Sequence, residues 1–240
     1  LQYYIIKDDV LFQRIREALL EKAAQGVEIR ILYDAMGCRS VGKHFWKEME
    51  KQGIHVAVFF PALFGRLHLR VNYRNHRKIA VIDGKVAYVG GFNIGKEYIG
   101  LDPKFGHWRD THLRICGSAV GGLLLRYIQD WDYAARENLF ENPKYFILPE
   151  EKAGNVKMQI ISSGPDSHSQ EIRNNYLRLI HMARKNIFIQ TPYFIPDDDI
   201  RDALIIAAKS GIDVRVMIPC KPDHPFVYWA TYSYIGEMVE

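Results

Sequence analysis

Apolar and polar positions follow two different rhythms along this chain, and each rhythm predicts a different element. Residues 9–25 carry apolar side chains at helical spacing and end at Gly26, a common stop for a helix. The flanking segments 1–6 and 27–33 are rich in β-branched or aromatic residues and predict strands. Helix and strand follow each other again over 43–59. Strands that alternate with helices favour an α/β fold with a largely parallel central sheet.

The next strands are predicted to form a hairpin. Asp83-Gly84 is a strong signal for a two-residue turn, and it lies between the apolar segments 79–82 and 86–89. A further strand and a long amphipathic helix are predicted over 108–115 and 118–136.

A helix–glycine–strand pattern occurs twice. Residues 18–31 align with 203–216 at one constant offset, and the glycines Gly26 and Gly211 coincide. Such units can resemble one another for physical reasons alone, or the chain can contain an internal duplication. Under the duplication hypothesis the chain has a first lobe over 1–140, a connector over 141–155 and the start of a second lobe over 156–240.

Composition and charge narrow the class of protein. The hydrophobic content of 48% and the charged content of 25% are those of an ordinary folded protein. The net charge of +4 is a mild basic excess, which suits an anionic membrane surface. Nucleic-acid-binding proteins usually carry a more concentrated basic charge than this. Three widely spaced cysteines argue against a disulfide framework and a zinc site, and favour a reducing compartment.

The length of the apolar runs indicates whether the chain can cross a membrane, and its first residues indicate whether it is a fragment. No run approaches the roughly 20 apolar residues of a membrane helix, so we expect a soluble or peripheral domain. The chain begins inside a predicted strand and without a methionine, so we expect it to be a fragment.

The strongest chemical signal is the run from His76 to Asn93, which has the spacing H-x-K-x4-D-x6-G-G-x-N. Side chains alternate across a strand, so His76 and Lys78 should point the same way. An imidazole beside a fixed ammonium is suited to attack on a phosphate ester. Asn93 offers an amide donor to a phosphoryl oxygen.

The other positions of the run have roles that the spacing leaves open. Asp83 falls on the opposite face of the strand and inside the predicted turn, which favours a structural role over contact with a phosphate. Gly90-Gly91 permits a tight turn or a close approach to a ligand. A nucleophilic histidine must be neutral, with its second ring nitrogen held by an acceptor, and Asp110 is the candidate acceptor. The alternative for Asp110 is a solvated strand residue.

The motif and its surroundings resemble the phospholipase D superfamily, and within it the bacterial cardiolipin synthases. The segments that carry the resemblance are 72–84, 90–95, 97–98, 108–112, 163–166 and 190–194. The resemblance implies a phospholipase D-like sandwich, an α/β fold in which a mixed sheet is flanked by helices. Two duplicated lobes would each contribute one His-Lys-Asp signature to a shared site. These 240 residues contain one such signature, so we expect the second lobe to be incomplete and its signature to lie beyond residue 240.

The resemblance also implies a reaction. A phosphatidyltransferase of this kind converts two phosphatidylglycerols into cardiolipin and glycerol through a phosphohistidine intermediate. By this resemblance His76 would be the nucleophile, Lys78 and Asn93 would stabilise phosphoryl oxygens, and Asp110 would be the acidic partner of His76. The candidate catalytic residues are His76, Lys78, Asp83, Asn93 and Asp110.

Further expectations concern partners and place. We expect no cofactor and no metal, because the lysine of the motif supplies the positive charge. Phosphatidylglycerol and an anionic membrane surface are the expected partners, with a homo-oligomer as an option and no nucleic acid. The expected place is the cell membrane, with a peripheral catalytic domain on the cytoplasmic side. We expect the 240 residues alone to be inactive.

Several alternatives stay open. The motif would also suit another phospholipase D-type phosphodiesterase, either a lipid hydrolase or a nuclease, or a non-catalytic lipid-binding domain. A nuclease would be expected to show a stronger basic field and aromatic stacking platforms. The apolar segment 59–67 is either a lipid-facing loop or a buried one. Asp197-Asp198-Asp199 could bind a metal, but acidic residues before a helix are more often caps.

Overall fold

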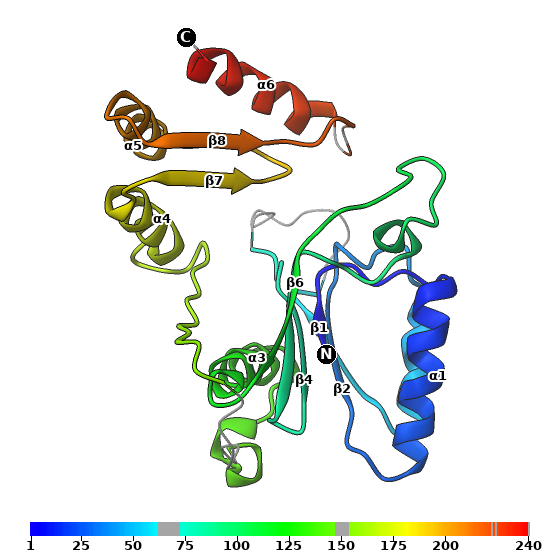
Figure 1. Ribbon diagram of the computed structural model, residues 1–240. Helices are drawn as coiled ribbons and strands as arrows, with labels where there is room; N and C mark the ends of the chain where they lie inside the picture. Colours follow the sequence, from blue (N-terminus) through cyan, green and yellow to red (C-terminus); the bar gives the residue numbers. More distant parts are fainter. Residues whose placement is uncertain (62–72, 147–153, 222, 224, 240) are drawn as a thin grey trace. The chain divides into compact units, whose positions relative to one another are not determined.

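The structure is a computed structural model that describes residues 1–61, 73–146, 154–221, 223 and 225–239. The chain forms two compact units, Leu1–Ile160 and Ile161–Glu240, which we describe one at a time (Figure 1). Residues 62–67 of the candidate lipid-facing loop lie outside the described residues, as do residues 147–153 of the expected connector.

The first unit is built on a six-stranded mixed sheet with the strand order β3-β2-β1-β4-β5-β6. Strands β1, β2 and β3 are parallel, whereas β4 runs antiparallel to β1 and begins an antiparallel β4-β5-β6 meander. The strands are β1 Gln2–Tyr3, β2 Arg30–Asp34, β3 His55–Phe59, β4 Lys78–Ile82, β5 Val86–Gly90 and β6 His112–Cys116. The mixed sheet is confirmed. The expectation of a largely parallel sheet is wrong for the half after β1, because hairpin and loop connections without a crossover helix join its strands.

Helices cover both faces of this sheet. Helices α1 (Val10–Ala24) and α2 (Lys43–Lys51) pack on one face and α3 (Ala119–Ala135) on the other, which Figure 1 shows for α1 and α3. A separate hydrophobic core lies on each face of the sheet, and successive residues of β2 contribute to both. Ile31 packs in the core with α1 and α2, and Leu32 packs in the core with α3. Each fully buried aliphatic side chain of this kind contributes about 1.5–3 kcal/mol to folding. Three short 3-10 helices are η1 Lys96–Ile99, η2 Leu139–Glu141 and η3 Pro143–Tyr145.

Side chains replace strand partners at the end of β1. A strand was predicted over 1–6, but regular pairing stops at Tyr3. The N–H of Ile5 donates to the Asn93 side chain at 3.0 Å, and the N–H of Ile6 donates to the Cys38 sulfur at 3.1 Å. The chain therefore leaves the sheet here with these two N–H groups bonded to side chains, while Ile5 O and the N–H of Lys7 bond to the backbone of Ile94.

The predicted helix and turn signals are confirmed where local geometry decides them. Asp9 caps α1 by accepting from the N–H groups of Leu11 and Phe12. In the β4-β5 hairpin, Asp83 and Gly84 have φ of 53° and 65°, and the N–H of Lys85 donates to Ile82 O at 3.0 Å. Positive φ at both central residues is the requirement of a type I′ turn.

The second unit is a two-stranded parallel sheet with three helices. Its elements are α4 Glu171–Met182, β7 Asn186–Gln190, α5 Asp198–Lys209, β8 Asp213–Met217 and α6 Pro225–Val239. The core is formed around Ile180, Phe194, Ala203 and Leu204. Asp197 caps α5 by accepting from the N–H of Ile200, so the capping prediction is confirmed for this residue.

The helix–glycine–strand pattern has the same geometry in both units. After α1 the N–H of Val27 donates to Lys22 O at 3.0 Å, and after α5 the N–H of Ile212 donates to Ala207 O at 3.1 Å. The intervening glycines, Gly26 and Gly211, have φ of 84° and 86°. The correspondence thus extends from sequence to hydrogen bonding, while the duplication of whole lobes stays a prediction. No helix in the described ranges has the length and apolar character needed to cross a membrane.

Candidate active site

The sheet places the motif where several strand ends meet. His76 lies two residues before Lys78, the first residue of β4. Strand β1 runs antiparallel to β4, and Tyr3 at its end pairs with Lys78. Strand β2 lies parallel to β1 and ends at Asp34. The start of the motif is therefore at the carboxyl ends of the parallel strands, the edge at which α/β sheets commonly bind ligands.

His76 and Lys78 are in direct contact, as the alternation of strand side chains predicts. The Lys78 Nζ lies 2.9 Å from Nδ1 and 3.1 Å from Nε2 of His76, and it donates to His76 O at 2.7 Å. An ammonium can only donate, so the ring nitrogen that faces it must accept, which requires a neutral imidazole. The contact thus favours the neutral form that a nucleophilic histidine needs.

The surroundings favour the same charge state. His76 is exposed on one side, but the loss of water on the side that faces the protein, together with the charge of Lys78, lowers its pKa to about 4. Burial lowers the pKa of Lys78 to about 8, and the carboxylate of Asp110 opposes that effect. At neutral pH His76 is therefore uncharged and Lys78 is charged. Lys78 is only 5% exposed, so its charge acts through little water and would stabilise an oxyanion strongly.

Asp110 lies close to the motif because of the two glycines. A Cβ atom on Gly91 would overlap the carboxylate of Asp110, and one on Gly90 would overlap the backbone and ring of His112. Glycine is thus required at both positions for close approach. The groups that approach are Asp110 and the start of β6, whereas the sequence suggested a tight turn or a ligand. Asp110 accepts a hydrogen bond from the N–H of Thr111 at 2.6 Å, and its role toward His76 stays a prediction.

Asn93 joins three parts of the first unit. Its Oδ1 accepts from the N–H of Ile5, and its Nδ2 donates to the hydroxyl of Tyr98 at 2.8 Å. The side chain is nearly buried, with 8% of the residue exposed. An amide nitrogen has two hydrogens, so one remains to carry the predicted contact with a phosphoryl oxygen.

The structure does not bring Asp83 to the other candidates. Asp83 is exposed and lies in the turn after β4, five residues from Lys78. Five residues of extended chain span about 16 Å. This placement agrees with a structural role for Asp83.

A buried polar network beside the motif was missed by the sequence analysis. Asn75 donates from Nδ2 to Asp130 at 3.0 Å and from its N–H to Asp34 at 3.1 Å. Gln2 donates to Asn75 at 2.8 Å and to Asp130 at 2.5 Å, while Arg77 pairs with Asp130 at 3.0 Å. Burying charges is costly unless they are paired, so the network fixes the segment that carries His76. An aspartate on the apolar face of the helix predicted over 118–136 was the available signal.

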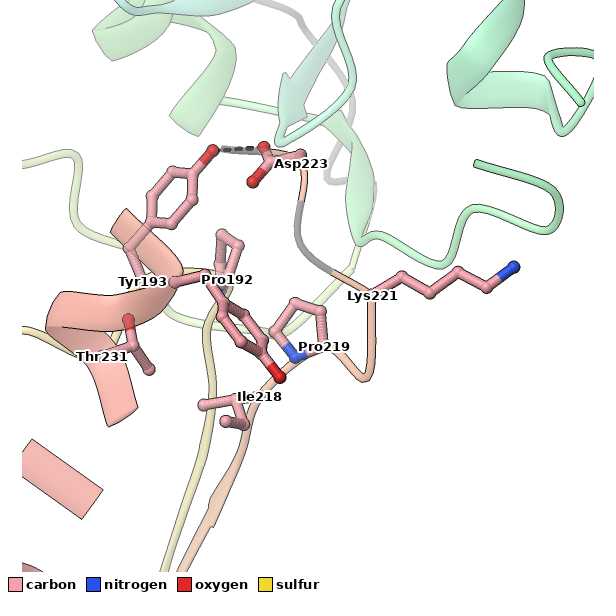
Figure 2. Close-up of a pocket in the computed structure, with 8 residues that line it drawn as sticks. Pro192, Tyr193, Ile218, Pro219, Lys221, Asp223 and Thr231 are labelled. Carbon is pink, nitrogen blue, oxygen red and sulfur yellow. Dashed lines mark hydrogen bonds between the residues drawn. The ribbon is translucent and has the colours of Figure 1, made fainter. Parts of the chain in front are cut away.

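The second unit contains a pocket at the carboxyl ends of β7 and β8 (Figure 2). Figure 2 shows the Tyr193 hydroxyl bonded to the carboxylate of Asp223, and the Lys221 side chain extending away from the pocket. The residues that line it are Pro192, Tyr193, Ile218, Pro219, Lys221, Asp223, Tyr228 and Thr231. None of the five candidate catalytic residues is among them.

Comparisons with known proteins show which curated proteins the chain is similar to. The chain is 54% identical to the major cardiolipin synthase ClsA of Bacillus subtilis (strain 168), over 100% of this chain and 50% of that protein. It is 50% identical to a cardiolipin synthase of Oceanobacillus iheyensis, again over 100% of this chain and 50% of the relative. The chain therefore spans about half the length of these curated relatives.

A solved structure and a family model complete the comparison. The phosphatidylserine synthase of Haemophilus influenzae Rd KW20 matches 99% of this chain and 62% of its own, with a TM-score of 0.63 and 14% identity, which shows a shared fold. The family model described as "Cardiolipin synthase, PLD-like domain" matches residues 1–102 and 176–240. The chain therefore belongs to the family of the cardiolipin synthase, phospholipase D-like domain, as the resemblance in its motif predicted.

Proposed function

We propose that this chain carries the phosphate-attacking part of a phosphatidyltransferase that converts two phosphatidylglycerols into cardiolipin and glycerol. The observation that carries the proposal is the 2.9 Å contact between the imidazole of His76 and the buried Nζ of Lys78. The names of the relatives support the substrate, because proteins sharing half or more of these residues are cardiolipin synthases.

The first step forms a bond between a ring nitrogen of His76 and the phosphorus of one phosphatidylglycerol. The bond from phosphorus to the headgroup glycerol breaks, and the glycerol oxygen takes up a proton as it leaves. In the second step a glycerol hydroxyl of another phosphatidylglycerol attacks this phosphorus and loses its proton. The phosphorus–nitrogen bond then breaks, which releases cardiolipin and restores His76. The resemblance assigns the proton transfers to the histidine of a second signature.

The remaining candidates act through charge and hydrogen bonds. The Lys78 ammonium would move from the ring to a phosphoryl oxygen as negative charge develops there, and the second Nδ2 hydrogen of Asn93 would donate to another oxygen. Asp110 would hold Lys78 charged, since its carboxylate raises the pKa of that lysine. Asp83 is left out of the proposed chemistry because of its place in the turn.

The proposed substrates are bilayer lipids, so we propose that the domain works at the surface of the cell membrane, on its cytoplasmic side. The basic excess of the chain would favour an anionic surface such as one rich in phosphatidylglycerol.

The test is product analysis with the full-length protein. Vesicles of phosphatidylglycerol should yield cardiolipin and glycerol in equal amounts, measured by mass spectrometry. A quench in denaturant at mildly alkaline pH should trap a phosphatidyl adduct on the peptide that contains His76, because a phosphorus–nitrogen bond to histidine is hydrolysed in acid. Phosphatidic acid as the sole lipid product would show a hydrolase instead, and an adduct on another histidine would show that the nucleophile is wrongly assigned.

A further inference from the structure

The aromatic ring of Tyr4 contacts both groups of the proposed reaction centre. Its centroid lies 4.7 Å from that of the His76 ring, with the two planes tilted by 49°. The Lys78 Nζ lies 5.5 Å from the same Tyr4 centroid. An ammonium at that distance from an aromatic ring is stabilised in its charged form. One side chain outside the sequence motif thus touches the imidazole and the ammonium together.

The backbone of Tyr4 is held in place by the turn that follows β2. Asp34 fixes this turn by accepting from the N–H groups of Met36 and Gly37 at 2.8 and 3.0 Å. A Cβ atom on Gly37 would overlap the carbonyl of Tyr4, so glycine is required for the turn to come this close.

Cys38 adds a second attachment between the turn and β1. Its sulfur donates to Tyr4 O at 3.5 Å and accepts from the N–H of Ile6 at 3.1 Å. The chain is therefore bonded immediately at and after Tyr4, and the direction of the Tyr4 side chain is set by buried groups.

We propose that Tyr4 is a positioning residue, whose ring holds the His76 imidazole and the Lys78 ammonium in the arrangement needed for attack on phosphorus. The proposal rests on the proposed function in one respect, that His76 is the nucleophile. Tyr4 acts by covering one side of the imidazole, whose other side is exposed, and by offering its ring to the ammonium. Its hydroxyl makes no hydrogen bond with any residue that the structure describes, so the ring alone carries the role.

The charges around the cluster determine what a change at Tyr4 would do. Lys78 faces His76, and Asp110 acts on Lys78. Asp34 and Cys38 act on the Tyr4 phenol from the turn, as do Arg39 and, from the segment before β4, Arg74. Replacing the ring by an aliphatic side chain leaves all these groups in place and removes the aromatic cover from one side of His76, a residue whose other side is already exposed.

The pKa of His76 should consequently rise. Burial is the main cause of its lowering from 6.5 to about 4, so loss of the ring should move this pKa back toward 6.5. A protonated imidazole is not a nucleophile, so the acid limb of the pH–rate profile should move to higher pH. A residue with a merely structural role would lower the rate without moving this limb.

The test measures the reactivity of His76 with diethyl pyrocarbonate in the full-length protein, across a range from about pH 4 to pH 8. The reagent modifies neutral imidazoles, and peptide mass spectrometry reports His76 separately. At about pH 5.5 the Tyr4→Leu variant should react up to about tenfold more slowly than the parent protein, the factor expected for a full return to 6.5. Tyr4→Phe should keep the parent profile, because it keeps the ring.

Matched variants keep the test decisive. Tyr133→Leu makes the same change at a tyrosine that is 53% exposed on α3, and it should leave the His76 profile unchanged. Tyr4→Met serves if Tyr4→Leu fails to fold by circular dichroism. A parent profile with its midpoint near 6.5, an unchanged profile in the aliphatic variants, or an equal shift in Tyr4→Phe would each overturn the proposal. Since this readout needs no lipid, a protein that failed to make cardiolipin would disprove the proposed function and leave the positioning result intact.

Discussion

The two ends of strand β4 carry residues of one sequence motif in opposite surroundings. At the amino end, Lys78 is 5% exposed, contacts His76 and is influenced by Asp110. At the carboxyl end, Asp83 is exposed and has a φ of 53°, in a turn whose geometry favours Asp-Gly. One motif therefore combines residues in a buried, charged setting with a residue in a turn that suits its backbone geometry. Strand alternation and the Asp-Gly turn signal already favour this division in the sequence.

The difference follows from what meets at each end. The amino end of β4 lies beside the carboxyl ends of β1 and β2, where the buried Asp34, Asn75 and Asp130 hold the chain. The carboxyl end closes on β5 through a short hairpin. At the first end burial and charge lower the pKa values of His76 and Lys78, while at the second end the Asp83 side chain is exposed to water.

The largest difference should appear when the motif residue at each end of β4 is replaced by asparagine. His76→Asn should lower cardiolipin formation by the full-length protein about 10⁴-fold or more, since the nucleophile is removed. Asp83→Asn should retain the rate within about threefold, because asparagine also tolerates positive φ. The rates are measured with phosphatidylglycerol vesicles, and thermal unfolding shows that both variants fold. An equal loss in the two variants would end the distinction between the two ends of β4.

The second-largest effect is expected from breaking the buried polar network beside the amino end of β4. Asp130→Ala leaves Arg77, Asn75 and Gln2 without their shared partner, and should lower the free energy of unfolding by about 3 kcal/mol. This loss of stability is at the low end for a broken buried ion pair, because Arg77 is partly exposed. Glu17→Ala, an exposed acidic residue of α1, should change it by less than about 0.5 kcal/mol in the same urea titration. Similar values for the two variants would show that the network does not hold the site.

The close approach of Asp110 gives a test of geometry at the amino end. Gly91→Ala should displace the Asp110 carboxylate and lower the rate about 10²-fold, the scale expected for a displacement of about 1 Å in a catalytic site. Gly42→Ala adds the same methyl group where no atom lies within 4 Å, and should leave the rate unchanged. A fully active Gly91→Ala enzyme would show that Asp110 does not need this position.

The smallest effect is expected at the turn. Asp83→Ala should lower the free energy of unfolding by about 1 kcal/mol, because alanine tolerates a φ of 53° poorly. Asp83→Gly should recover most of that loss, and cardiolipin formation should be retained in both variants. Loss of activity with unchanged stability would assign chemistry to Asp83 after all.

Predictions from sequence succeeded where neighbouring residues decide the structure. The helix expected over 9–25 is α1, with Asp9 as its cap and Gly26 as its stop. The turn at Asp83-Gly84 and the pairing of His76 with Lys78 follow from φ preferences and strand alternation. These features depend on residues only a few positions apart.

Predictions failed, or could not be made, where distant segments meet. The strand expected over 1–6 is shortened to Gln2–Tyr3, because Asn93 and Cys38 take the next backbone groups. The direction of the later strands depends on which edge of the sheet they join. Gln2 bonds with Asp130 from 128 positions away, and no periodicity in the sequence encodes that contact.

The sequence by itself determined the local elements, the family and the residue types able to attack a phosphate, because motif spacing and side-chain alternation act over short distances. Only the tertiary structure decided what surrounds these residues. It buried Lys78 beside His76, brought Asp110 against Gly91, placed Tyr4 on the imidazole and left Asp83 in an exposed turn. The physical reason is that burial and charge pairing depend on contacts between strands and helices far apart in the chain, and these contacts set the charge state of the site.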